Sequence, residues 1–134
     1  MMKREQGKVL VVDDEPDVCY LFGRILSQRN IRVDFAHNLA EANSAIQNDP
    51  PALVFLDNNL PDGQGVDLIP FLKENYPHTK IVMVTANDSL GDKKKAFSKG
   101  ADEFLGKPLS LAGINFTLDH MGDAQRKAET FPEM

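Results

Sequence analysis

The sequence predicts an α/β fold in which a five-stranded parallel sheet is doubly wound, with helices on both faces. Short apolar segments alternate with amphipathic segments five times along the chain, as in strands joined by right-handed helical crossovers. Acidic or polar residues directly follow several of the apolar segments. Open parallel sheets bind ligands at the carboxyl ends of their strands, so these residues are candidates for a functional site.

The composition is that of one globular domain. The chain has 134 residues, of which 42% are hydrophobic and 26% charged, enough to bury one core. Its longest apolar runs are about six residues, against roughly 20 for a membrane span, and no signal-peptide pattern begins the chain, so a cytoplasmic protein without membrane contact is expected. The net charge of −5 argues against direct nucleic-acid binding. Cys19 is the only cysteine, which excludes a disulfide framework.

The first predicted strand is Lys8–Val12, a nearly continuous apolar segment. A helix follows, with Pro16 in its first turn and an end near Asn30. Its apolar residues recur at helical spacing and define one buried stripe: Val18, Leu21, Phe22, Ile25 and Leu26.

The second and third strands differ in their expected burial. Ile31–Phe35 alternates between apolar and polar residues, which indicates one less buried face. Asn38 and Glu41 then form a capping box for a helix that extends to about Asn48. Ala52–Leu56 is apolar throughout and bounded by prolines, which predicts a strand buried on both faces.

The next two helices flank the fourth strand, Lys80–Val84. Before this strand, a helix is predicted that Pro70 bends and Pro77 ends. After it, Ser89–Gly100 forms a helix in which the run Lys93–Lys95 is expected to be a solvated face.

The chain closes with a short fifth strand, Glu103–Leu105, and a helix over Leu109–Met121. Residues 1–121 are predicted to be the domain itself. Residues 122–134 have little apolar content and are expected to form a flexible tail or the start of a linker to an absent output domain.

Five polar side chains should converge at the carboxyl ends of the strands: Asp13, Asp14, Asp57, Thr85 and Lys107. Crowded carboxylates either retain a proton or bind a cation, and an all-oxygen ligand set favours Mg²⁺, with Mn²⁺ as the alternative. A metal ion beside an ammonium and a hydroxyl suits a transferring phosphoryl group. Asp57 is then the nucleophile, and the product is an aspartyl phosphate.

Four segments carry a resemblance to a known family: VVDDEP, DNNLPDGQG, VTA and GADEFLGKP. Together they resemble the receiver domain of two-component response regulators over roughly residues 7–121. The resemblance implies the flavodoxin-like strand order 2-1-3-4-5. It also implies that Asp57 accepts a phosphoryl group from a sensor histidine kinase or a histidine phosphotransfer protein.

The resemblance also assigns the metal ligands. Mg²⁺ would be held by the carboxylates of Asp14 and Asp57, by the main-chain carbonyl of Asn59 and, through water, by Asp13. Thr85 and Lys107 would contact the phosphoryl oxygens.

A switch is implied as well. In the family, phosphorylation draws the hydroxyl at Thr85 inward and lets the aromatic at Phe104 turn in behind it, which remodels the surface of helix four, strand five and helix five. Asn59 and Asn87 occupy the positions that influence access of water to the phosphoryl group. The Lys107–Pro108 peptide bond has a prior of only about 5% of being cis, which the resemblance raises considerably.

Other functions remain open at this point. A degenerate receiver would act only as a docking module. An Asp-nucleophile phosphohydrolase would need a second acid where this chain has Asn59, and a flavin-binding module would need a phosphate cradle where Asp13 and Asp14 repel phosphate. If the chain is a receiver, we expect it to act on an output domain or a target protein and to form a homodimer linked to phosphorylation. We expect no enzyme activity on other substrates.

Overall fold

The computed structural model describes residues 7–86 and 90–130, with side chains through Met121. One sheet contains five strands: β1 (Lys8–Val12), β2 (Arg32–Ala36), β3 (Leu53–Asp57), β6 (Lys80–Thr85) and β7 (Glu103–Gly106). Their order is β2-β1-β3-β6-β7, and all neighbouring pairs are parallel. Because β6 and β7 are the fourth and fifth strands of this sheet, the predicted order 2-1-3-4-5 is confirmed.

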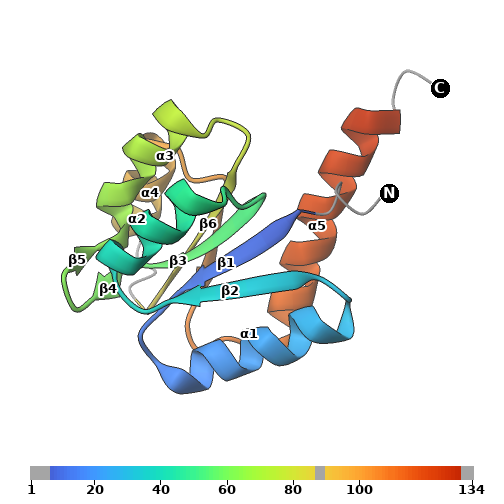
Figure 1. Ribbon diagram of the computed structural model, residues 1–134, viewed down its shortest axis with the longest axis horizontal. Coiled ribbons are helices and arrows are strands. Elements are labelled where there is room, and N and C mark those ends of the chain that lie inside the picture. Colours follow the sequence, from blue (N-terminus) through green and yellow to red (C-terminus); the bar gives the residue numbers. More distant parts are fainter. Residues whose placement is uncertain (1–6, 87–89, 131–134) are drawn as a thin grey trace.

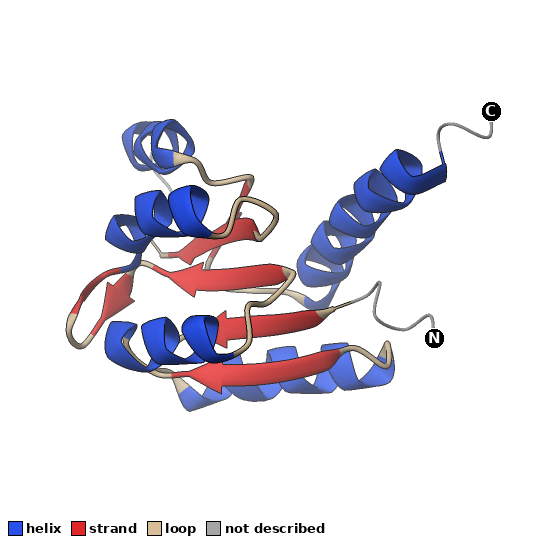
Figure 2. Ribbon diagram, turned by 45° about the horizontal axis from the view of Figure 1, so that its top comes forward, coloured by secondary structure: helices blue, strands red, loops and turns tan. Residues whose placement is uncertain are grey.

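Helices cover both faces of the sheet. They are α1 (Pro16–Gln28), α2 (Leu39–Asn48), α3 (Ile69–Asn75), α4 (Leu90–Lys99) and α5 (Leu111–Thr130). Helices α1 and α5 pack on one face, and α2, α3 and α4 pack on the other (Figures 1 and 2). The doubly wound architecture is therefore confirmed. None of the helices in the described ranges is long and apolar enough to cross a membrane.

Alternate residues of each central strand supply two separate cores. In β1, Leu10 and Val12 pack with α2, α3 and α4, while Val9 and Val11 pack with α1, where Phe22 is buried. Burial on both faces explains why the central strands are apolar except at their ends. The edge strand β2 is exposed along most of its length, as its alternating sequence predicts.

A hairpin after β3 was not predicted. Strands β4 (Asn59–Leu60) and β5 (Gly63–Gln64) pair antiparallel and lie outside the main sheet. Each strand has only two residues, too few for a periodic pattern to be recognised. A 3₁₀ turn, η2 (Gly65–Leu68), then leads into α3.

The prediction that Pro70 bends the helix after Gly65 is wrong. Because η2 occupies the first residues, α3 begins only at Ile69 and Pro70 falls in its first turn. A backbone N–H in the first turn of a helix has no intrahelical acceptor. Proline, which has no N–H, is therefore well tolerated there.

The predicted bounds of the last helix are also wrong. It begins at Leu111, after Ser110 caps its first turn by accepting a hydrogen bond from the Gly113 N–H at 2.9 Å. It then continues to Thr130, beyond the predicted end at Met121. The sequence DAQRKAE after Gly122 consists mainly of good helix formers, which low apolar content had obscured.

Two carboxyl or amide side chains cap the N-terminus of α2. Asn38 accepts the Glu41 N–H at 2.7 Å, as the capping box predicts, while the Glu41 carboxylate accepts the N–H of His37 rather than that of Asn38. In addition, Asp62 in the hairpin accepts the N–H groups of Leu39 and Ala40 at 2.8 and 3.1 Å. The hairpin after β3 is thereby fastened to α2.

Candidate functional site

The strand ends bring the predicted site residues together. Asp13 follows β1, while Asp57 and Thr85 are the last residues of β3 and β6. These three side chains are buried, with exposed fractions of 2–3%. Since β3 lies between β1 and β6, Asp57 occupies the centre of the site. Lys107 arrives from the end of β7.

The ammonium group of Lys107 is shared among carboxylates. Its Nζ lies 3.1 Å from Asp13 Oδ2, 3.2 Å from Glu15 Oε1 and 3.5 Å from Asp57 Oδ1. Sequence reasoning did not anticipate the part played by Glu15, although its place directly after two aspartates could have suggested it. The Lys107–Pro108 peptide bond is cis, the isomer that the family resemblance favours.

Three acidic side chains form a cluster that could hold a metal ion. Asp13, Asp14 and Asp57 each offer a carboxylate oxygen, and these oxygens lie within 4.8 Å of one another. Asp14 is exposed, so the cluster opens to solvent on its side. The donors are all oxygen, which suits a hard cation such as Mg²⁺. The backbone N–H of Asn59 is hydrogen-bonded to Asp57, which places Asn59 beside the cluster.

The electrostatics of the cluster also favour a cation. Burial raises the pKa of Asp57 to about 6, and the charge of Asp13 contributes to this rise. Burial likewise raises the pKa of Asp13. For Lys107, burial acts to lower the pKa, but the contacts with Asp13 and Asp57 outweigh it and the pKa is raised. One ammonium therefore does not fully compensate the carboxylates, and a bound cation would relieve the remaining repulsion.

The raised pKa of Asp57 predicts a pH-dependent stability in metal-free buffer. Between pH values of about 4 and 6, the folded protein retains a proton that the unfolded chain, with a carboxyl pKa of 3.8, has lost. Stability should therefore fall as the pH rises through this window. At about 1.4 kcal/mol per pKa unit, the loss is at most about 3 kcal/mol.

Urea unfolding of the wild type and an Asp57→Asn variant at pH 4 and pH 7 checks this expectation. The variant lacks the titrating group, so its free energy of unfolding should exceed that of the wild type by a larger amount at pH 7 than at pH 4. An advantage that stays the same at both pH values would contradict the assignment of the shift to Asp57.

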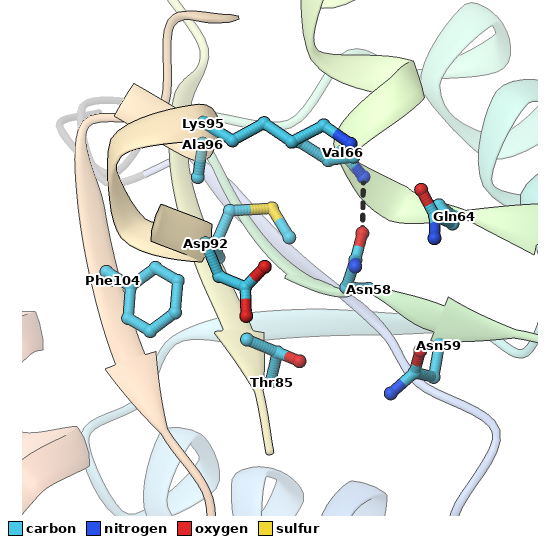
Figure 3. Close-up of a pocket in the computed structure, with 10 residues that line it drawn as sticks. Asn58, Asn59, Gln64, Val66, Thr85, Asp92, Lys95, Ala96 and Phe104 are labelled. Carbon is cyan, nitrogen blue, oxygen red and sulfur yellow. Dashed lines mark hydrogen bonds between the residues drawn. The ribbon is translucent and has the colours of Figure 1, made fainter. Parts of the chain in front are cut away.

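A small pocket adjoins the cluster on the side of α4. It has a volume of about 110 Å³ and lies between the hairpin and α4, with Thr85 and Phe104 in its wall (Figure 3). Phe104 is half-buried and packs against the core beneath α2, α3 and α4. The two predicted switch residues thus border one cavity. Asn87 lies outside the described residues.

The backbone after Asp57 is tightly constrained, which sequence reasoning missed. Gly65 approaches so closely that an added Cβ would lie 2.1 Å from the Asp57 carbonyl oxygen. Asn58 closes the same loop, because its carbonyl and its side-chain oxygen accept the N–H groups of Gly65 and Val66 at 3.0 and 2.9 Å. The motif DNNLPDGQG therefore encodes the position of Asp57 as well as its identity.

Cys19 is close to the site but is not a candidate nucleophile. Its Sγ donates to the Asp13 carbonyl at 3.4 Å. Burial raises the pKa of this thiol to about 11, with the charges of Asp13 and Asp14 adding to the effect. The thiol therefore stays protonated at neutral pH.

Known proteins that are similar in sequence to this chain are response regulators. A sequence model of the response regulator receiver domain matches residues 9–118. The response regulator protein PilR of Pseudomonas aeruginosa is 38% identical over 107 residues, which cover 80% of this chain and 24% of PilR. The photosynthetic apparatus regulatory protein RegA of Rhodovulum sulfidophilum is 28% identical over 120 residues, covering 90% of this chain and 66% of RegA. The chain thus spans only part of these relatives.

Solved structures agree with the fold. A CheY-like response regulator receiver domain protein from Methanospirillum hungatei superposes with a TM-score of 0.84 at 27% identity, covering 90% of this chain and 97% of that one. The beryllofluoride-activated NtrC4 receiver domain dimer gives a TM-score of 0.82 at 36% identity, covering 88% and 98%.

Proposed function

Because this chain belongs to the response regulator receiver family of two-component systems, we propose that it accepts a phosphoryl group on Asp57. The donor is a phosphohistidine of a sensor histidine kinase or a histidine phosphotransfer protein. One observation carries the proposal. The buried Asp57 carboxylate stands at the centre of the sheet edge, with Lys107 Nζ 3.5 Å away and two further carboxylates within 4.8 Å.

The residues present fit a divalent cation of the Mg²⁺ or Mn²⁺ type. The ligands would be the carboxylates of Asp14 and Asp57, the main-chain carbonyl of Asn59 and, through water, Asp13. When bound, the ion neutralises charge on the phosphoryl oxygens and on the crowded carboxylates. The raised pKa of Asp57 supports this role, because a bound cation would lower that pKa and keep the carboxylate in its nucleophilic, ionised form.

Phosphoryl transfer itself needs few groups. An Asp57 oxygen forms the new bond to phosphorus while the bond from phosphorus to the donor imidazole nitrogen breaks, and the imidazole leaves with that electron pair. Lys107, and Thr85 at the end of β6, stabilise the phosphoryl oxygens during transfer. Lys107 must then exchange part of its contact with Asp13 and Glu15 for the phosphoryl group.

We do not expect the protein to hydrolyse other phosphate esters. A phosphohydrolase with an aspartate nucleophile needs a second acid to protonate its leaving group, and the residue two positions beyond Asp57 is Asn59. The protein would therefore catalyse only its own phosphorylation and dephosphorylation. A module that acts only by docking would not require these buried, mutually repelling carboxylates.

The output is a change at the surface of α4, β7 and α5. Movement of Thr85 toward the phosphoryl group would enlarge the adjoining pocket, and Phe104 in its wall would turn inward. Such a two-state element is biased by the local change in charge. The partners that read it are an output domain or target protein in the cytoplasm, or a second copy of the chain; the NtrC4 receiver is described as a dimer when activated by beryllofluoride.

Incubation with Mg²⁺ and a small acyl phosphate tests the proposal. Mass spectrometry should find a single added phosphoryl group, labile to hydroxylamine, and chelation of Mg²⁺ should prevent its formation. A chromogenic phosphate ester should not be turned over. Repeated turnover of the ester would identify a hydrolase instead, and no modification at all would favour a docking module.

A further inference from the structure

The ring of Phe104 carries a contact that its role in the proposed switch does not require. The ammonium of Lys93, from α4, lies over the ring at 5.6 Å from the centroid. This is within the range of a cation–π interaction. Lys93 is half-buried, whereas Lys94 is exposed. Lys93 is therefore not simply part of the solvated face that the lysine run predicts.

The contact lies outside the pocket that Phe104 borders. The pocket is lined on the α4 side by Asp92, Lys95 and Ala96 (Figure 3), and Lys93 does not line it. Phe104 thus borders the pocket and also contacts Lys93, which is not among the residues that line the pocket. A turn of the ring into the pocket would change this contact, because a cation–π interaction depends on the position of the ring relative to the cation.

We propose that Lys93 is a positioning residue that holds the Phe104 ring in its present position and so opposes activation of the switch. The inference rests on the proposed function, which gives the movement of Phe104 its meaning. A phenylalanine lacks the hydroxyl with which a tyrosine could hold an outward position by hydrogen bonding. In this chain the cation above the ring supplies the restraint.

The size of the effect follows from the type of contact. A partly exposed cation–π pair shifts an equilibrium by about two- to fivefold. Lys93→Met removes the charge and keeps an unbranched apolar stem, so it should favour the inward ring. Because activation and binding of a phosphoryl analogue are linked, the variant should bind the analogue about two- to fivefold more tightly.

The direction of the change in affinity distinguishes the cation–π contact from a long-range effect of the lysine charge on the anion. Removal of a cation near an anion site ordinarily weakens anion binding. Lys94→Met is the matched control, since it removes the same charge from the neighbouring exposed position. It should leave the affinity unchanged or slightly weaker, whereas Lys93→Met should strengthen it. Lys93→Arg retains a cation that can stack on the ring and should behave like the wild type.

The experiment titrates the full 134-residue chain with beryllium fluoride at saturating Mg²⁺ and follows the amide resonances of Thr85 and Leu105 by NMR. Urea unfolding of each variant shows whether stability has changed. The Lys93→Met effect should disappear in a Phe104→Leu background, which has no ring for the cation to hold.

Tighter binding in Lys93→Met, restored to the wild-type value by arginine and absent without the ring, supports the inference. Equal affinities in Lys93→Met and the wild type overturn it, as does a gain that persists in the Phe104→Leu background. If the wild type itself gives no response to beryllium fluoride and Mg²⁺, the proposed function fails, and the inference fails with it. The two failures are therefore distinguishable.

Discussion

An Asp57→Asn variant is expected to lose phosphorylation completely while remaining folded. The amide has nearly the shape of the carboxyl group but lacks its nucleophilic oxygen, so no acyl phosphate can form. The substitution also removes a buried negative charge beside Asp13, which should leave the metal-free protein at least as stable as the wild type. Incubation with an acyl phosphate and Mg²⁺, followed by mass spectrometry of the intact protein, measures the loss.

Asp67→Asn provides the matched control. Asp67 follows the same hairpin but is exposed and belongs to η2 rather than to the carboxylate cluster. This variant should be phosphorylated as fast as the wild type. Retention of the phosphoryl group by the Asp57→Asn protein would show that another residue is the acceptor.

Gly65→Ala should have the largest effect on stability. A Cβ at this position would lie 2.1 Å from the carbonyl oxygen of Asp57 and 2.9 Å from Leu56 Cγ. Both neighbours belong to the central strand β3, so neither can move without disturbing the sheet. We expect a loss of about 3 kcal/mol in the free energy of unfolding, together with slower phosphorylation because the clash displaces the backbone that carries Asp57.

Gly23→Ala tests whether this cost arises from the close approach. An added Cβ at Gly23 in α1 would meet only Phe35 Cζ, at 3.4 Å, and alanine is favoured over glycine within a helix. Urea unfolding should therefore show little loss, or a gain, for this variant. Similar losses in both variants would mean that the contact at Asp57 is not the cause.

The large-scale fold was predictable because burial imposes a clear pattern on it. Strands β1, β3 and β6 are covered on both faces, so their segments are mainly apolar. Asp57 and Thr85 are the last residues of β3 and β6, and Asp13 directly follows β1. The parallel arrangement then brings those ends together. For this reason the sequence alone predicts that Asp13, Asp57 and Thr85 lie at one edge of the sheet.

Two unpredicted contacts join residues of different elements. Glu15 reaches Lys107 across 92 positions, and Lys93 reaches Phe104 from a different element. Neither pairing leaves a periodic signal. The extension of α5 to Thr130 differs from the predicted end for another reason. The residues after Gly122 have low apolar content, which predicts no buried face, but their helix propensity is sufficient to continue the helix.

The attachment of the hairpin to α2 makes the two sides of the site differ in how firmly they are held. On the hairpin side, Asp62 binds two backbone N–H groups of α2, and Asn58 closes the loop beside Asp57. On the opposite side, α4 buries only Ala96 among its described residues. If Asp57 is phosphorylated as proposed, we therefore expect the change in charge to displace α4 before it displaces the hairpin, so that the signal leaves the site on the side of α4.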